Sequence, residues 1–385
     1  MYNSGGTFVT FVTFATSVTV RMKVVLATGI YPPDIGGPST YVSNLARELS
    51  GKEIETIVLT YGSRGDRETE AAGGGWTIVR VSKRGGPFAR WSRYAHALRE
   101  HAANADILYA FSSISCGVPL ILSRLKHPKR ILRLGGDFLW ERYTDRGGEL
   151  GLRAWYEQGP WFHGLMNGIL KSFDHIVFST VFQQQLYERF YRRLPQHSVI
   201  ENALPHGEPT LHALDGPLKM LFLGRFVAFK NLESLLRALS EVPDVTLTIV
   251  GDGPKASQLQ TIVQELHLED RVRFLPPAHG DEKQVLFQGH HVLVLPSHTE
   301  ISPNAALEAR AAGLPVLLTE ETGLSRMLTD GTLLRPLVTP RQIAQGIRDV
   351  IEQYPVLAER AASPLPDRGW SHVCDEHLTL FRSIL

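Results

Sequence analysis

The stretch that decides the fold is Pro-Ser-His-Thr-Glu-Ile-Ser-Pro-Asn-Ala-Ala-Leu-Glu-Ala-Arg-Ala-Ala-Gly-Leu-Pro-Val, residues 296–316. It follows a short apolar run at 291–295, which is typical of a buried parallel strand. We expect Asn304 to be the N-cap of a helix that stops near Gly313, before a second strand at 315–319. Strand, loop, helix and strand in this order form half of a nucleotide-binding α/β unit.

Two carboxylates lie where such a unit binds its ligand. In open parallel sheets, ligands bind at the carboxyl ends of the strands. Glu300 stands in the loop after the first strand, and Glu308 stands one turn into the helix. A carboxylate suits a sugar because it can accept hydrogen bonds from two neighbouring hydroxyls. Taken singly, each glutamate is also explained as a solvated acid, and the helix dipole favours Glu308.

The spacing Glu-x7-Glu, with its flanking Pro-Ser and Glu-Ala-Arg-Ala-Ala-Gly-Leu-Pro-Val, resembles the signature of the retaining glycosyltransferases of the GT-B fold, family 4. The resemblance implies an α/β protein with two Rossmann-like, doubly wound domains that face a cleft. It implies that Glu300 contacts the transferred sugar and that Glu308 holds the ribose of the donor. Ser302, Pro303 and Asn304, which lie between the two glutamates, are then expected in the donor site.

Two cations follow the strand expected to start at Lys219, in Gly224-Arg225 and Lys230-Asn231. In a strand-to-helix loop, an Arg can hold phosphate oxygens with two N–H groups, and a Lys adds a compact charge. Both could equally be ordinary surface cations. The pair resembles the Gly-Arg…Lys-Asn element of the same family, which implies that Arg225 and Lys230 bind the donor diphosphate.

A glycine-rich turn at Gly36-Gly37 follows the first expected strand, which starts at Met22. Such a turn before a helix presents backbone N–H groups and the positive end of the helix dipole to an anion. The turn also resembles the family's first loop, which approaches the donor diphosphate across the cleft. The alternative is a tight turn that needs glycine only for its backbone.

The strand expected at 130–134 ends in Gly135-Gly136-Asp137, where many family members carry a His that faces the sugar and the acceptor. No His stands here. Two roles remain open for Asp137: it orients the acceptor hydroxyl, or it caps a turn after the two glycines. We include Asp137 with Arg225, Lys230 and Glu300 among the candidate catalytic residues.

A length of 385 residues is too long for one ordinary core. The segment 205–217 is rich in Pro and Gly without periodicity, which is typical of a linker. Residues 1–20 carry no charge and are too polar for a clear membrane span. We therefore expect an extension at 1–21, an acceptor domain at 22–204, the linker, a donor domain at 218–365, and a C-terminal helix at 366–385 that returns to the first domain, as the resemblance implies.

The net charge of +1 gives no global attraction to nucleic acid, and two cysteines make no disulfide framework, which suits a reducing cytoplasm. Basic residues and tryptophans gather at Arg124, Lys126, Lys129, Arg130, Arg133, Trp140, Trp155 and Trp161. Two interpretations remain open: peripheral contact with the inner leaflet of an anionic membrane, or a solvated basic face beside core tryptophans.

The resemblance implies an enzyme that moves a sugar from a UDP- or GDP-linked donor to a hydroxyl acceptor. A lipid-linked or saccharide acceptor of the cell envelope is expected. No cofactor and no metal are expected, since no two aspartates are spaced Asp-x-Asp. Two alternatives remain: an epimerase of the same fold that converts free sugar nucleotide, and a non-catalytic sugar-nucleotide-binding protein.

Overall fold

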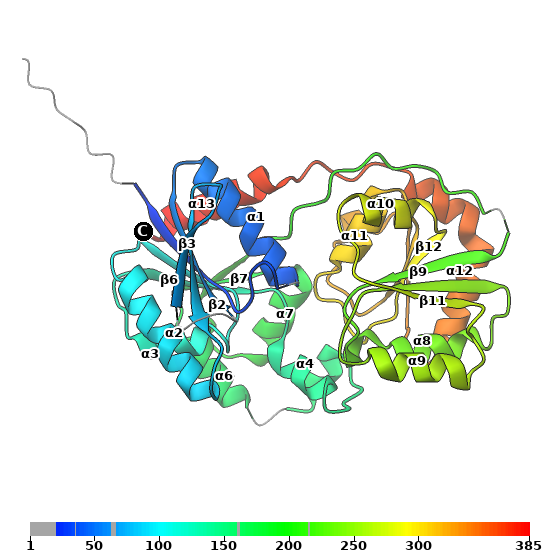
Figure 1. The fold of residues 1–385 in the computed structure, drawn as a ribbon, viewed down its shortest axis with the longest axis horizontal. Coiled ribbons are helices and arrows are strands. Elements are labelled where there is room, and N and C mark those ends of the chain that lie inside the picture. The colour runs from blue at the N-terminus through cyan, green and yellow to red at the C-terminus, as the bar shows by residue number, and fades with distance from the viewer. Residues whose placement is uncertain (1–20, 35, 63–66, 160–161, 215) are drawn as a thin grey trace, which may run out of the picture.

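The computed structural model describes residues 21–34, 36–62, 67–159, 162–214 and 216–385, and Figure 1 shows their arrangement in two α/β domains. The expected extension at 1–21 therefore lies outside the described residues, except for Arg21. Trp161 also lies outside them. Within the described part, no helix combines the length and the apolar character that a membrane crossing requires.

The first domain is built on a sheet with the order β3-β4-β2-β1-β5-β6-β7-β8. All neighbouring pairs are parallel except β3 with β4. The strands run outward from β1 on both sides, which makes this a doubly wound sheet. Its strands are β1 (Lys23–Ala27), β2 (Glu55–Gly62), β3 (Arg67–Ala71), β4 (Thr77–Ser82), β5 (Ile107–Ala110), β6 (Lys129–Leu134), β7 (His175–Phe178) and β8 (Gln196–Val199).

Helices cover both faces of this sheet because its buried strands alternate between two cores. On β1, Val24 and Leu26 join one apolar cluster, and Val25 and Ala27 join the other. The helices that follow these strands are α1 (Gly37–Gly51), α2 (Pro87–Ala102), α3 (Gly117–Ser123), α4 (Phe138–Thr144), α5 (Leu152–Glu157), α6 (His163–Leu170) and α7 (Val181–Phe190).

The second domain is built on a parallel sheet with the order β11-β10-β9-β12-β13-β14. This is the order of a dinucleotide-binding sheet, and it reverses between β9 and β12. Its strands are β9 (Leu218–Leu223), β10 (Val245–Val250), β11 (Val272–Leu275), β12 (Val292–Leu295), β13 (Val316–Thr319) and β14 (Thr332–Arg335). The helical segments of this domain are η1 (Ala228–Lys230), α8 (Leu232–Leu239), α9 (Ala256–Glu265), α10 (Asp281–Gln288), α11 (Asn304–Ala311), η2 (Arg326–Leu328) and α12 (Pro340–Ala361).

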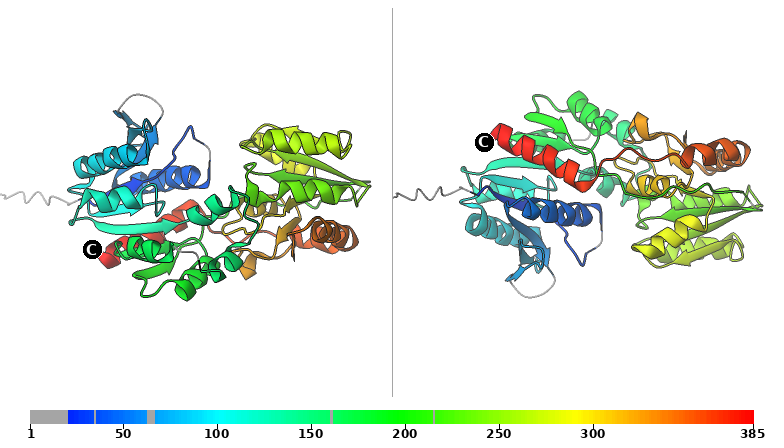
Figure 2. Two further views of the ribbon diagram at one scale, coloured as in Figure 1. Left: turned by 90° about the horizontal axis from the view of Figure 1, so that it is seen from below. Right: turned by 90° about the horizontal axis from the view of Figure 1, so that it is seen from above.

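The chain crosses between the domains twice, and the two crossings lie side by side (Figure 1). The first crossing leaves the first domain after β8, and the second returns after α12. They are joined where the N–H of Leu204 donates to the carbonyl of Arg368 at 2.8 Å. The second crossing ends in helix α13 (Trp370–Ile384), which packs on α1 and covers one face of the first sheet (Figure 2).

The strands differ from the sequence-based expectation in two places. The sequence pattern predicts strands at 54–61 and 76–82 with only a Gly- and charge-rich turn between them, but an antiparallel strand, β3, occupies that turn. The sequence Ser198-Val-Ile-Glu-Asn202 predicts the last strand of the first domain, but the observed strand β8 ends at Val199. The backbone beyond Val199 instead begins the crossing to the second domain.

The segment that holds Trp140, Trp155 and Trp161, which we call the tryptophan segment, contributes its two described tryptophans to the core of the first domain. Trp140 and Trp155 are 2% and 5% exposed, and both join the cluster that packs under α2, α3 and α6. Arg133 is also buried, so it is not part of a basic surface. Of the two interpretations of this segment, core packing explains the two described tryptophans.

Candidate active site

The candidate site lies where the second sheet reverses its order. β9 and β12 pair with each other at the centre of this sheet, and β10 and β13 lie on their outer sides. The segment 224–230, which we call the cation loop, follows β9, and the loop with Glu300 follows β12. The carboxyl ends of strands at such an order reversal are the usual ligand position in this class of sheet.

Glycine holds the cation loop in place through two close backbone approaches. A Cβ atom on Gly253 would lie 2.5–2.8 Å from backbone atoms of Phe226, and one on Gly251, where φ is +144°, would collide with Gly224. Without side chains at these positions, the N–H of Phe226 reaches the carbonyl of Asp252 at 2.9 Å. The loop after β10 therefore supports the backbone of Arg225 from behind.

The two cations of this loop differ in their present contacts. Arg225 is exposed, and its side chain forms no hydrogen bond or ion pair within the described residues. The Nζ of Lys230 lies 2.6 Å from Oε1 of Glu300 in a pair whose side chains are 16% and 7% exposed. The hydroxyl of Ser297 donates to the same Oε1 at 2.6 Å. The structure thus joins Lys230 to Glu300 and leaves Arg225 available.

Glu308 lies in α11, half-buried, and its Oε2 accepts a hydrogen bond from Nζ of Lys283 at 2.8 Å. Lys283 comes from α10, and the sequence analysis did not single it out. The only sequence feature that could have pointed to Lys283 is its place in the first turn of α10, the helix that precedes β12. The pairing holds the carboxylate of Glu308 in one orientation.

The start of α11 corrects one expectation. The N-cap is Pro303, and Asn304 is the first helical residue and caps nothing with its side chain. The side chain of Asn304 instead accepts a hydrogen bond from Asn202 of the first domain at 2.7 Å. The amide of Asn202 also donates to the hydroxyl of Ser302 at 2.9 Å. Ser302 and Asn304 therefore link the second domain to Asn202.

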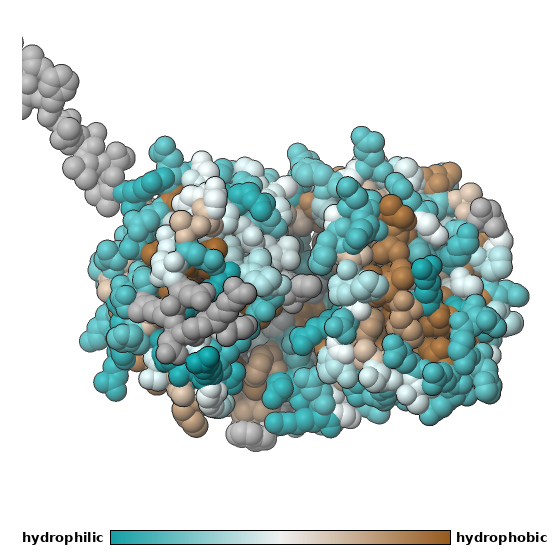
Figure 3. All heavy atoms as spheres, viewed as in Figure 1, coloured by the Kyte–Doolittle hydropathy of each residue, from teal (hydrophilic) through white to brown (hydrophobic). Residues whose placement is uncertain are grey.

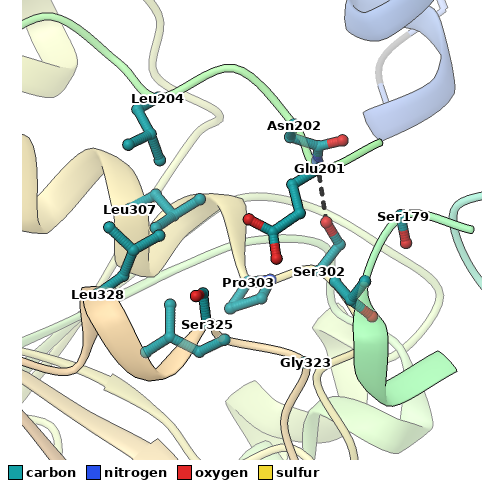
Figure 4. Close-up of a pocket in the computed structure, with 12 residues that line it drawn as sticks. Ser179, Glu201, Asn202, Leu204, Ser302, Pro303, Leu307, Gly323, Ser325 and Leu328 are labelled. Atoms are coloured by element: carbon teal, nitrogen blue, oxygen red, sulfur yellow. Dashed lines mark hydrogen bonds between the residues drawn. The ribbon is translucent and has the colours of Figure 1, made fainter. Parts of the chain in front are cut away.

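Figure 4 shows the pocket beside this link, which residues of both domains line. The carboxylate of Glu201 points into it, and burial raises the pKa of this group above its usual value. Leucines from both sides of the domain boundary close one end, at Leu204, Leu307 and Leu328.

The glycine-rich turn of the first domain stands at the start of α1, with Gly36 as the N-cap and Gly37 as the first helical residue. A Cβ atom on Gly37 would meet no described atom within 4 Å, so this position is open. Figure 1 shows α1 starting at the side of the first domain that faces the second.

The sequence left two roles open for Asp137, and the structure shows the capping role. It is 4% exposed, and its Oδ1 accepts the backbone N–H of Trp140 at the start of α4. Its Oδ2 accepts hydroxyl hydrogen bonds from Tyr156 at 2.6 Å and Tyr187 at 2.9 Å. With both oxygens already bonded to the protein, Asp137 has little capacity left for a substrate hydroxyl.

A carboxylate that the sequence analysis passed over lies one turn further along α4. Glu141 is half-buried and electrostatically coupled to Lys230 and Arg225 across the domain boundary. Burial raises its pKa to about 7, aided by the carboxylates of Asp137 and Asp145. The sequence spacing could have pointed to Glu141, because a residue four positions after Asp137 lies on the same side of the helix.

Two family models match the chain, and together they span both domains. The model described as Glycosyltransferase Family 4 matches residues 35–206, and the model described as Glycosyl transferases group 1 matches residues 210–363. The chain belongs to the glycosyltransferase family 4 of the GT-B fold, as the Glu-x7-Glu signature indicated.

A D-inositol 3-phosphate glycosyltransferase from Mycolicibacterium smegmatis is 32% identical over 170 residues. This match covers 42% of the chain but spans only 39% of the relative.

Solved structures match over nearly the whole chain. Sucrose-phosphate synthase from Thermosynechococcus elongatus has a TM-score of 0.77 at 19% identity and covers 94% of this chain and 99% of its own. Anabaena HepE, solved with UDP-glucose, has a TM-score of 0.70 at 15% identity, with 94% and 100% covered. These likenesses confirm the two-domain GT-B fold.

Proposed function

We propose that this protein transfers a sugar from a nucleoside diphosphate to a hydroxyl acceptor and retains the configuration of the anomeric carbon. One observation carries the proposal: two cations and two carboxylates lie at the order reversal of the second sheet. Arg225 and Lys230 follow β9, while Glu300 and Glu308 follow β12. A ligand with an anionic centre and hydroxyl-bearing sugars on both sides fits this arrangement.

The charges match the course of such a reaction. As the bond to the sugar breaks, the sugar gains oxocarbenium character and negative charge grows on the diphosphate. Arg225 and Lys230 would stabilise that charge, because preorganised electrostatics is often the largest catalytic contribution. Glu300 would hold hydroxyls of the transferred sugar, and Glu308 those of the ribose. The backbone around Ser302 and Pro303, at the start of α11, would face the phosphates together with Gly36 and Gly37.

UDP-linked sugars are the first donors to test, since the structural neighbour HepE holds UDP-glucose. GDP-linked sugars are the second. We propose no cofactor and no metal, because the cation loop itself supplies positive charge for the diphosphate. Within the described residues, no cluster of three or more His, Cys, Asp or Glu could hold a metal ion.

We propose a lipid-linked or saccharide acceptor at the cytoplasmic face of the cell envelope. Peripheral contact with the membrane would then involve α2 rather than the tryptophan segment. Phe88 on α2 is 82% exposed, its ring packs edge-on against Trp91, and Arg84 is exposed nearby in sequence. Sedimentation with anionic vesicles tests this part, and equal recovery of wild type and Phe88→Ser would contradict it.

The test of the main proposal uses radiolabelled UDP- and GDP-sugars, with and without a lipid extract. Label on the lipid or on an added saccharide supports transfer, and NMR of the product reports the anomeric configuration. An altered free sugar nucleotide without acceptor would instead indicate an epimerase. Binding without turnover would indicate a non-catalytic protein.

The matched variants are Lys230→Ala and Arg237→Ala. Lys230 belongs to the proposed diphosphate site, whereas Arg237 forms an exposed pair with Glu233 on α8 at 2.9 Å. Transfer should fall in the first variant and stay at the wild-type rate in the second. Equal turnover in both variants would contradict the assignment of the site.

A further inference from the structure

Glu141 lies on the wall of the first domain that faces the cation loop. Its helix, α4, packs against η1, where the ring centroids of Trp140 and Phe229 are 5.3 Å apart. Phe229 directly precedes Lys230, and Lys230 and Arg225 both act electrostatically on the carboxylate of Glu141. The proposed diphosphate position therefore has cations of one domain and a carboxylate of the other near it.

The carboxylate of Glu141 is free to bind a ligand. It forms no hydrogen bond or ion pair with any residue that the structure describes, in contrast to the fully bonded Asp137. A Cβ atom on Gly136 would lie 2.7 Å from Oε1 of Glu141, so the carboxylate rests directly against this glycine. A Cβ atom on the adjacent Gly135 would meet no described atom within 4 Å. The backbone next to this glycine is therefore open at Gly135.

The stereochemistry of the proposed reaction says what must come to this place. When configuration is retained, the new bond forms on the face of the sugar that the diphosphate leaves. The acceptor hydroxyl must therefore arrive beside the diphosphate, which Arg225 and Lys230 would hold. A polar group of the first domain that faces these cations is in position to meet the hydroxyl.

We propose that the ionised carboxylate of Glu141 accepts a hydrogen bond from the acceptor hydroxyl and aims its oxygen at the anomeric carbon. This inference rests on the proposed glycosyl transfer. It gives the first domain a substrate-binding carboxylate at the place where the sequence analysis considered Asp137. Glu141 would act on the acceptor, whereas the donor would be held by the second domain and by the glycine-rich turn at Gly36 and Gly37.

The groups that face Glu141 tune its charge near neutral pH. Burial, together with Asp137 and Asp145, raises the pKa of the carboxyl to about 7, and Lys230 and Arg225 oppose this rise. The carboxyl is therefore ionised above about pH 7 and protonated below it. Only the ionised form can accept a charge-assisted hydrogen bond, so acceptor use should fall as the pH drops through 7.

The test compares Glu141→Gln with wild type in acceptor kinetics, donor kinetics and donor hydrolysis without acceptor. The amide keeps the shape but loses the charge, so kcat/KM for the acceptor should fall roughly 10- to 100-fold. The donor KM and the rate of donor hydrolysis should stay within about twofold, since Glu141 is not among the groups that would hold the donor. The fall of kcat/KM for the acceptor below about pH 7, which we call the pH limb, should disappear in the variant. Glu141→Asp should keep this limb at a reduced rate.

The matched control is Glu157→Gln, which removes an exposed carboxylate that pairs with Arg189 at 3.1 Å. It should leave all these quantities unchanged. Wild-type acceptor kinetics and an unchanged pH limb in Glu141→Gln would overturn the role of Glu141 while the glycosyl transfer stands. A wild-type protein that neither hydrolyses nor transfers from any nucleotide sugar would overturn both.

Discussion

At the scale of single residues, both glutamates of the candidate site are paired with a lysine. Glu300 places one oxygen against both Lys230 and Ser297, and Glu308 is paired with Lys283. Each of these contacts fixes a charged side chain near the position that it would use toward the donor. The pairing also limits the cost of burying Glu300, since a carboxylate without a partner is expensive to desolvate.

Lys230→Ala and Glu308→Ala should change different kinetic constants: the first should lower kcat, and the second should raise the donor KM. The charge that Lys230 would meet grows as the sugar leaves, so kcat should fall by the equivalent of about 2–4 kcal/mol. The proposed ribose contact of Glu308 is equal in ground and transition states, so its loss should mainly raise the donor KM. Steady-state kinetics with varied donor distinguish the two.

Glu300→Ala should reduce kcat and raise the donor KM together, because the sugar that it would hold changes shape during the reaction. Lys230→Ala should also lower stability by about 1–3 kcal/mol, since the buried Glu300 loses its cation. Wild-type kinetics and wild-type melting temperatures in all three variants would contradict the whole site.

Glu141 should make the stability of the protein fall with rising pH. In the unfolded chain its carboxyl ionises near its ordinary value of 4.5, whereas in the folded protein it ionises at about 7. Below 4.5 both states hold the proton, so the group has no effect there. Between these values the unfolded state loses its proton first, and stability decreases until about pH 7.

Glu141→Gln should therefore melt at a higher temperature than wild type at pH 8, with a smaller difference at pH 5.5. The gain has an upper bound of about 3 kcal/mol. Thermal melting of both proteins at the two pH values measures it, with Glu157→Gln as the control. A lower melting temperature for Glu141→Gln at pH 8 would show that the carboxylate supports the fold.

The candidate site shows which functional residues can be predicted from the sequence alone. Glu300, Glu308, Arg225 and Lys230 stand at fixed offsets from strand ends, so local spacing and the family resemblance found them. Glu141 acquires its significance only from a contact between domains, which no local pattern records. Asp137 illustrates the same limit, because its bonds come from Tyr156 and Tyr187, far along the chain.

At the scale of elements, the parallel strands were the most predictable part. Buried strands read as continuous apolar runs, and β12 and β13 lie within one residue of the expected ranges at each end. The strand β3 was not predictable in this way, because Arg67-Glu-Thr-Glu-Ala71 is a polar sequence at the edge of the sheet. Its pairing with β4 comes from tertiary context.

Helix α13 should be a structural part of the first domain. Phe381 is completely buried, and its ring contacts Tyr109 of β5 with the centroids 5.8 Å apart. Phe381→Ala should cost about 3–5 kcal/mol, because it removes a large buried side chain and leaves a cavity. Thermal melting followed by circular dichroism measures the loss.

The control for this prediction is Leu385→Ala, at the end of the same helix, where the side chain is 58% exposed. It should change the stability by no more than about 0.5 kcal/mol. Equal melting temperatures for the two variants would mean that α13 contributes little to the first domain.

At the scale of the whole molecule, the domains are joined by specific contacts around the site. The backbone N–H groups of Leu152 and Arg153 donate to Thr299 at 2.8 Å and to Glu321 at 2.9 Å. Thr299 also donates to Glu321 and directly precedes Glu300. Figure 3 shows the molecule as two lobes with a recess between them. A rotation of one lobe against the other would therefore act directly on the loop that carries Glu300.

Activity should survive the removal of divalent metal ions. The positive charge that the leaving diphosphate requires would come from Arg225 and Lys230, both fixed by the cation loop. Turnover measured in EDTA should therefore equal turnover in added magnesium or manganese. Abolition by EDTA with rescue by either ion would show that the protein cations are insufficient.

The return of α13 to the first domain has a consequence for synthesis on the ribosome. The first domain is translated through β8 long before α13 emerges, because the whole second domain lies between them. At ordinary translation rates this delay is roughly 10–40 s, during which the apolar face under α13 has no cover. A nascent chain in this interval would lack the contacts that Trp370 and Phe381 of α13 make with Tyr41 and Tyr109. The same connection that ties the two lobes together therefore makes the growing chain a client for chaperones that shield apolar surface until the last helix arrives.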